Sequence, residues 1–125
     1  MRANENIGLI ALHTVFMREH NRLCDVFLAK NPKLTDEQLY QMARNYVVGL
    51  IQHITMDEYL LFLLGKTQFD AWVGNYTYQE SVNPDLYTEF NSAAFRIGHY
   101  MINSPYKFMD NSGTVLKNLT LGEMF

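Results

Sequence analysis

The sequence has one cysteine, three prolines and few charged residues, and each scarcity limits what the chain can be. Cys24 alone cannot form an internal disulfide or a cysteine-based zinc site. Lysine and arginine do not cluster and the net charge is −3, which argues against nucleic acid as a partner because phosphate recognition needs a basic face. No uninterrupted apolar run approaches the roughly 20 residues of a membrane-spanning helix, so no integral membrane segment is expected.

Large apolar side chains are abundant instead. The 125 residues are 48% hydrophobic and 14% aromatic, which predicts a single globular domain over residues 1–125. So much apolar surface has to be buried, in part against a ligand or another chain. The N-terminal stretch "MRANENIGLIALH" has no small-residue cleavage site, so it is not predicted to be a secretory signal.

The first half of the chain has the period of α-helices. Apolar residues at helical spacing predict a long helix over residues 5–29, which Pro32 then interrupts. Thr35 and Gln38 form a T-x-x-Q capping box, the sequence signature of a helix N-terminus. A second long helix is therefore predicted to begin there.

A second capping box follows, and then the pattern weakens. Thr55 and Glu58 predict the start of a short apolar helix, which Gly65 could end in a left-handed cap. Residues 66–82 carry aromatic side chains without a sustained period. They predict an ordered loop packed on another part of the molecule.

One more helix and a turn complete the predicted elements. Asn83 and Pro84 are typical of an N-cap and a first helical residue, and they predict a helix over residues 84–103. After Pro105, an Asp-Asn-Ser-Gly turn lies between short mixed runs, which predicts a small hairpin or irregular chain. The fold class is therefore all-α with a short irregular or hairpin C-terminal stretch.

His99 is the residue of the last helix that raises a functional question. On a helical projection it lies opposite the apolar stripe, together with Phe95 and Ile102, so the helix is predicted to be buried on two sides. Gly98 costs about 1 kcal/mol relative to alanine in a helix interior, which is explained if a group approaches the backbone there. The pattern alone leaves two interpretations of His99, a hydrogen-bonded core side chain or a metal ligand.

The other histidines and the cysteine give weaker predictions. No glutamate has a histidine three residues later, so the di-iron bundle motif is missing. His13 and His20, about 10.5 Å apart along a helix, cannot share one ion. His53 and Asp57 have the spacing of two ligands, although such a pair more often faces water. Cys24 would be a nucleophile only beside a base, and its apolar neighbours favour a small core residue.

Three stretches carry a resemblance to a known family: "RANENIGLIALHTVFMREHNRLCDVF", "IQHITMDEYLLFLLG" and "VNPDLYTEFNSAAFRIGHYM". In order and spacing they resemble the animal-type haem peroxidases of the peroxidase–cyclooxygenase superfamily, over essentially the whole chain. The resemblance is to the central, helical segment of the haem peroxidase core. It implies haem b as cofactor, hydrogen peroxide with a small electron donor or halide as substrates, and a secreted or extracytoplasmic location.

The resemblance implies roles for three residues at the haem. Arg2 matches the distal arginine that polarises bound hydrogen peroxide and stabilises the departing hydroxide. Glu5, three residues later and so expected on the same helical face, matches the glutamate that in some members forms an ester to a haem methyl. His99 matches the proximal histidine that ligates the haem iron.

Residues near His99 are implied to complete the haem contacts. Phe95 and Ile102 would face the flat macrocycle, and Arg96 matches the arginine normally found one turn before the ligand. The oxygenase branch of the superfamily has a tyrosine at the position of Arg96, so this residue favours the peroxidase branch. Asn6 stands where some members have a methionine, so a sulfonium link to haem is not expected.

Two family residues have no match in this sequence. The family's distal histidine lies on a helix before the distal arginine, and the asparagine that hydrogen-bonds the proximal histidine lies on a later helix. Peroxide heterolysis needs a base, so activity in this chain alone is expected to be weak or absent. The alternatives are completion of the site by another chain or a second copy, and a non-enzymatic helical interaction module that keeps the scaffold.

Overall fold

A computed structural model describes residues 2–74 and 76–125, and for Arg2 the backbone alone. The chain is mostly helical with one two-stranded sheet, so the predicted all-α class with a C-terminal hairpin is confirmed. It divides into two compact units, one formed by Met1–Leu9 with Gln79–Phe125 and the other by Ile10–Tyr78. We describe each unit by itself, and the single-domain assignment stays a prediction.

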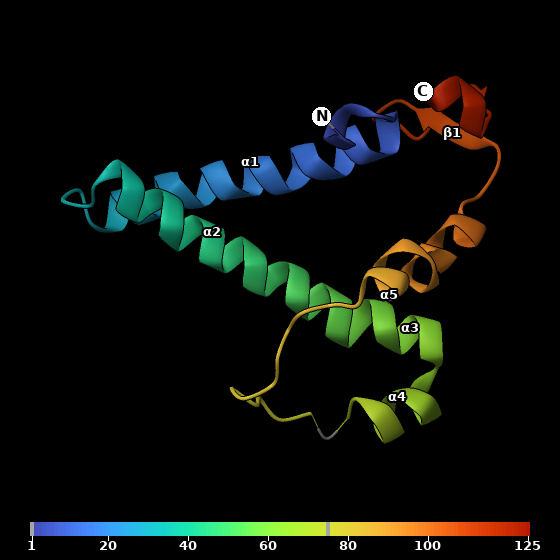
Figure 1. The fold of residues 1–125 in the computed structure, drawn as a ribbon. Coiled ribbons are helices and arrows are strands. Elements are labelled where there is room, and N and C mark those ends of the chain that lie inside the picture. The colour runs from blue at the N-terminus through green and yellow to red at the C-terminus, as the bar shows by residue number, and fades with distance from the viewer. Residues whose placement is uncertain (1, 75) are drawn as a thin grey trace. The chain divides into compact units, whose positions relative to one another are not determined.

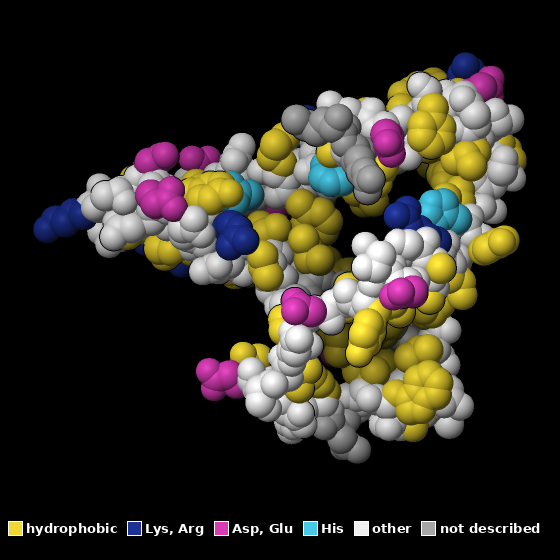
Figure 2. All heavy atoms as spheres, in the orientation of Figure 1, with side chains coloured by type: hydrophobic (Ala, Val, Ile, Leu, Met, Phe, Trp, Pro, Cys, Tyr) yellow, Lys and Arg dark blue, Asp and Glu magenta, His cyan; other side chains and the backbone are white. Residues whose placement is uncertain are grey.

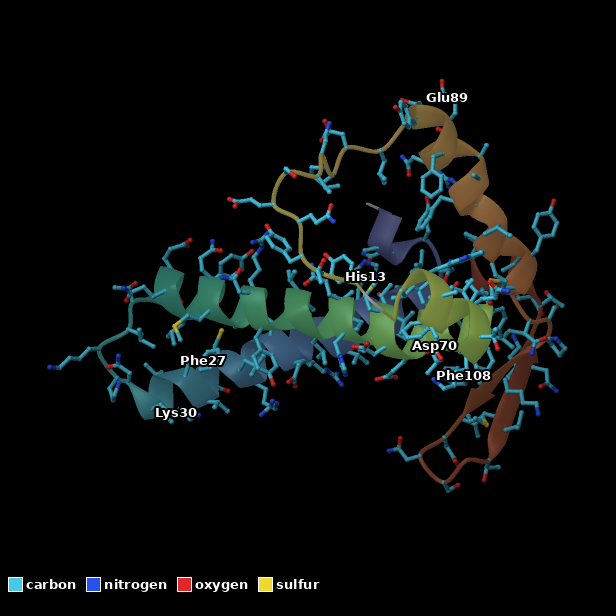
Figure 3. The ribbon with its side chains drawn as sticks, turned by 90° about the horizontal axis from the view of Figure 1, so that it is seen from below. His13, Phe27, Lys30, Asp70, Glu89 and Phe108 are labelled. Atoms are coloured by element: carbon cyan, nitrogen blue, oxygen red, sulfur yellow. The ribbon has the colours of Figure 1, made fainter. Side chains whose placement is uncertain are left out.

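Helix α1 spans Ile7–Lys30 and supplies the first part of the Ile10–Tyr78 unit (Figure 1). Its N-terminus is capped by Asn6, whose Oδ1 accepts a hydrogen bond of 2.9 Å from the backbone N–H of Leu9. Phe27 and Lys30 mark its C-terminal end (Figure 3). The predicted helix over residues 5–29 is therefore confirmed to within two residues at each end.

Helix α2 spans Asp36–His53 and begins with the predicted capping box. The Thr35 hydroxyl accepts from the backbone N–H of Gln38 at 3.3 Å, and the Gln38 side-chain oxygen accepts from the backbone N–H of Thr35 at 2.9 Å. Two N–H groups that a helix start leaves without partners are satisfied in this way. Leu23 of α1 and Leu39 and Ala43 of α2 are the buried residues of these two helices.

The prediction of a second capping box at Thr55 and Glu58 is wrong. The Thr55 hydroxyl donates to the carbonyl of Ile51 at 2.8 Å, which is a bond back into the preceding turn. The helix therefore does not stop but continues through a π-helical segment, Ile54–Tyr59, into α3, Leu60–Leu64. No proline or glycine interrupts the chain between these segments, so nothing ends the helix before Gly65.

Gly65 ends α3 and precedes another helix. Its φ of 73° has the expected positive sign, but its ψ of 158° lies outside the left-handed helical region. Helix α4, Lys66–Trp72, follows where a loop over residues 66–82 was predicted, and this part of the prediction is wrong. An i,i+4 ion pair of 2.8 Å between Lys66 and Asp70 accompanies the helix.

The continuous helical stretch Asp36–Leu64 has 29 residues and is long and apolar enough to cross a membrane, since 18 consecutive residues within it have a mean hydropathy of 1.4. It is the one stretch among the described residues that meets this criterion. Core helices of water-soluble domains meet it as well, so the observation assigns no membrane location.

The Met1–Leu9 and Gln79–Phe125 unit contains short elements. In chain order they are the 3₁₀ turn Arg2–Asn4, α5 at Thr88–Ser92, the 3₁₀-helix Ala94–Met101, β1 at Tyr106–Met109, β2 at Val115–Leu119 and the 3₁₀ turn Leu121–Met124. The strands pair antiparallel, with Tyr106 opposite Leu119. Leu119 and Met124 are the buried residues here, and the Met124 side chain lies beside Gly8.

The hairpin turn is organised by one carboxylate. Asp110 Oδ1 accepts hydrogen bonds from the Ser112 hydroxyl at 2.6 Å and from the backbone N–H groups of Ser112 and Thr114 at 2.8 and 3.0 Å. These bonds, the one from the Ser112 side chain foremost, lower the pKa of Asp110 below its ordinary value. Gly113 takes a φ of 84°, which the tight turn requires.

The predicted continuous helix over residues 84–103 is wrong. The Asn83 side chain accepts from the backbone N–H of Asp85 at 3.0 Å and forms a turn there, so α5 begins only at Thr88. Ala93, with φ of −122° and ψ of −70°, breaks the helix, and the chain continues as a 3₁₀-helix. All of these residues are exposed, so the packing that normally stabilises a long helix is missing, and the two-sided burial predicted for it is also wrong.

The two T-x-x-Q/E boxes should respond differently to mutation. Thr35→Ala removes a cap and should lower the free energy of unfolding by about 1 kcal/mol. Thr55→Ala removes only a bond back into the helix and should change it by no more than a few tenths of a kcal/mol. Urea denaturation followed by circular dichroism measures both, and equal losses in the two variants would contradict the assignment.

Candidate functional site

His99 lies in the 3₁₀-helix and is exposed. Its Nδ1 is 2.9 Å from the carbonyl oxygen of Arg96. A carbonyl oxygen only accepts hydrogen bonds, so Nδ1 carries the proton and Nε2 carries the lone pair. The side chain is therefore not the buried core histidine of the first interpretation, and its local bond sets the tautomer that binds a metal through Nε2.

The 3₁₀ geometry explains this contact. With about three residues per turn, Arg96 and His99 lie on one line along the helix. Arg96 in turn donates through Nε to the carbonyl of Asn91 in α5 at 3.3 Å. The 3₁₀-helix is thus tied to α5 by the residue whose carbonyl orients His99.

Phe95 and Ile102 flank this segment with exposed apolar surface. Phe95 is 66% exposed, and its ring lies 6.0 Å from that of Phe90 of α5, centroid to centroid, at an angle of 44°. Ile102 follows the last 3₁₀ residue and is 40% exposed. Figure 2 shows exposed hydrophobic side chains over much of the visible surface. Apolar area is therefore available for a ligand or for further protein.

The prediction that Arg2 and Glu5 lie on the same face of one helix is wrong. The backbone of Arg2 lies in the first 3₁₀ turn, and its side chain lies outside what the structure describes. Glu5 is exposed and lies between the end of that turn at Asn4 and the start of α1 at Ile7. The two residues therefore do not share a face of one α-helix.

All of the predicted haem residues lie in the same compact unit, although the N-terminal pair and the others are about ninety residues apart in sequence. They are Arg2, Glu5, Phe95, Arg96, His99 and Ile102. The sequence order alone could not indicate this grouping. It follows from the association of residues 1–9 with residues 79–125.

The other candidate ligands do not form a metal site. His53 Nδ1 and Asp57 Oδ2 are 2.6 Å apart, and their side chains are 64% and 58% exposed. They bond to each other, so this pair is a solvent-facing contact. His13 lies on α1 (Figure 3), and among the residues that the structure describes no group of three or more His, Cys, Asp or Glu side chains could hold a metal ion.

Sequence reasoning missed a histidine beside the cysteine. His20 Nδ1 lies 3.9 Å from Sγ of Cys24, which is one helical turn further along α1. The i,i+4 spacing was the available signal, because residues four apart share a helix face. Cys24 is half-buried and therefore only partly a core residue.

The family model for animal haem peroxidase matches residues 1–125 of this sequence. The chain therefore belongs to the animal haem peroxidase family. Peroxinectin A of Dictyostelium discoideum is 38% identical over 120 residues, which are 96% of this chain and 22% of that protein. Human thyroid peroxidase is 40% identical over 112 residues, which are 89% of this chain and 12% of that protein.

A solved structure agrees with these sequence matches. Peroxidase A from Dictyostelium discoideum matches with a TM-score of 0.85 and 36% identity over 99% of this chain. The match covers 23% of that structure's chain. The chain thus spans less than a quarter of the length of each of these relatives.

Proposed function

We propose that this chain carries the proximal side of a haem site, with His99 as the axial iron ligand and peroxide-dependent oxidation as the reaction. The observation that carries the proposal is the 2.9 Å contact between His99 Nδ1 and the Arg96 carbonyl. Metal-binding histidines commonly donate their second ring N–H to a carbonyl or carboxylate, which fixes the ring and raises its basicity. Membership in the haem peroxidase family supplies the cofactor class.

The residues around His99 fit a haem. The exposed rings and side chains of Phe95 and Ile102 offer the apolar contacts that a flat macrocycle needs. Arg96 orients the ligand through its carbonyl and anchors the segment to α5 through its guanidinium. When bound, haem b would supply the redox iron, which would reduce hydrogen peroxide and oxidise a small donor or halide.

Haem binding tests the proposal directly. Titration of the chain with haemin should give a Soret shift that saturates near about one haem per chain, and His99→Ala should abolish it because the iron loses its axial nitrogen. His53→Ala is the matched control, since His53 is also exposed and bonded through Nδ1. Equal haem binding by His99→Ala and the unmodified chain would assign the ligand elsewhere.

Arg2 is proposed to stabilise negative charge on the departing oxygen of peroxide. Arg2→Ala in the haem-loaded chain should retain haem and slow the reaction with hydrogen peroxide by about 10²-fold, the typical effect of losing one such group. Stopped-flow absorbance measures the rate. Arg18→Ala, a change of an exposed arginine on α1, is the control. An unaltered rate in Arg2→Ala removes this residue from the mechanism.

Glu5 is proposed as the anchor of a covalent haem ester, because its carboxylate is exposed in the unit that contains His99. After turnover with peroxide, acid extraction and digestion should leave haem mass on the peptide that contains Glu5. Glu5→Gln should release all haem, whereas Glu89→Gln, at an exposed position of α5, should not change the result. Complete extraction from the unmodified chain contradicts the ester.

A helical interaction module without enzymatic activity is the second candidate. The observation in its favour is the exposure of large apolar side chains on every helix described here, for example Leu12, Tyr46, Phe62 and Trp72. A folded chain that shows no specific haemin shift would support it. Completion of the site by a second chain or copy, and an extracytoplasmic location, remain predictions that go with the peroxidase assignment.

A further inference from the structure

Cys24 and His20 form a pair on one face of α1, in the Ile10–Tyr78 unit. Cys24 Sγ lies 3.9 Å from His20 Nδ1 and 3.7 Å from the carbonyl oxygen of Leu39 in α2. The thiol hydrogen therefore has two acceptors within reach, one of which is a base. Imidazole next to a thiol is the arrangement that activates cysteine nucleophiles.

The His20 imidazole has polar neighbours at both of its ring nitrogens. Its Nε2 lies 3.2 Å from the carbonyl oxygen of Tyr40, and its Nδ1 lies 3.2 Å from Oδ1 of Asn21. The carbonyl oxygen of Tyr40 can only accept a hydrogen bond, so Nε2 carries a proton and, in the neutral ring, Nδ1 beside Cys24 carries the lone pair. The Tyr40 ring, with its centroid 5.1 Å from that of His20, holds the imidazole in place. His20 is thus arranged to take the proton of Cys24.

A cavity gives small molecules access to this pair. It has a volume of about 550 Å³, and its lining residues come from the C-terminal half of α1 and the N-terminal half of α2. These parts of the two helices lie next to their connecting turn (Figure 1). The pair lines it together with three carboxylate side chains, those of Asp25, Asp36 and Glu37. The carboxylates on its rim disfavour anionic reagents, so a small uncharged electrophile such as hydrogen peroxide fits best.

We propose that Cys24 is a peroxide-sensitive modification site activated by His20. His20 takes the thiol proton, and the thiolate sulfur attacks one oxygen of hydrogen peroxide. The O–O bond breaks as the S–O bond forms, and the departing hydroxide takes the proton back from His20 as water. Sulfur is oxidised by two electrons, peroxide is reduced by two, and the net reaction is thiol plus peroxide to sulfenic acid plus water.

The sequence also determines what can follow. The chain has no second cysteine, so the sulfenic acid cannot be converted into a disulfide within this chain. A small external thiol could cap it, which would place a bulky group where α1 contacts Leu39 and Tyr40 of α2. The reaction requires peroxide but no haem, so it is independent of the proposed axial role of His99.

Labelling of the haem-free chain tests the proposal. After limited treatment with hydrogen peroxide, a 1,3-dione probe for sulfenic acid should add mass to the peptide that contains Cys24, and Cys24→Ser should show no label. His20→Gln should slow the labelling by about tenfold to a hundredfold because the base is lost. His13→Gln, on the same helix, should label at the rate of the unmodified chain.

Two comparisons make the outcome decisive. Circular dichroism of each variant shows whether the helices remain. If His20→Gln does not fold, the rate of the unmodified chain is compared with that of N-acetylcysteine at the same pH, and activation predicts that Cys24 reacts faster. A Cys24 rate no greater than that of the small thiol, or equal rates in folded His20→Gln and the unmodified chain, overturns the proposal.

Discussion

The shortage of buried surface is the constraint on which the other features of this structure depend. Among the described residues the buried apolar side chains are Leu23, Leu39, Ala43, Leu119 and Met124. Three of them serve α1 and α2, and two serve the hairpin and the turn after it. Elsewhere the chain relies on local hydrogen bonds: the caps at Asn6 and Thr35, the carboxylate in the hairpin turn and the short-range bonds around His99.

This constraint explains which predictions from the sequence were right. The first helix was predicted from its apolar period, and the capping box at Thr35 and the C-terminal hairpin from signals within a few residues; the structure contains all three. Thr55 carries the same signal as Thr35 but follows a helix that has not ended, so its hydroxyl bonds backwards. The helix over residues 84–103 was predicted from Asn83 and Pro84 as its start, and an apolar stripe was expected along it. The stretch is exposed throughout and forms shorter, tighter turns instead, because little packing is present there to stabilise a long helix.

The candidate sites also contain features that the sequence predicted and others that only the structure revealed. The role of His99 came from family resemblance, and family membership is now shown, but the residue roles remain proposals. Its carbonyl partner was not predicted, because residues three apart in an α-helix differ by about 60° around the axis, whereas the 3₁₀ turn places Arg96 and His99 on one line. For Cys24 the base was visible in the sequence at i−4. The contacts with Leu39 and Tyr40 depend on a second helix and required the structure.

The π-helical turn at Ile54–Tyr59 affects how the long helical stretch presents its two ends. A π-turn accommodates about one residue more than an α-turn, which rotates everything that follows by about 100° around the axis. The phase that Leu39 and Ala43 set in α2 is therefore shifted before Leu60–Leu64, where all five side chains are apolar. The stretch thus changes the directions of its side chains at the π-turn, and deletion of a single residue within it would restore the α-helical phase of α2 through Leu60–Leu64.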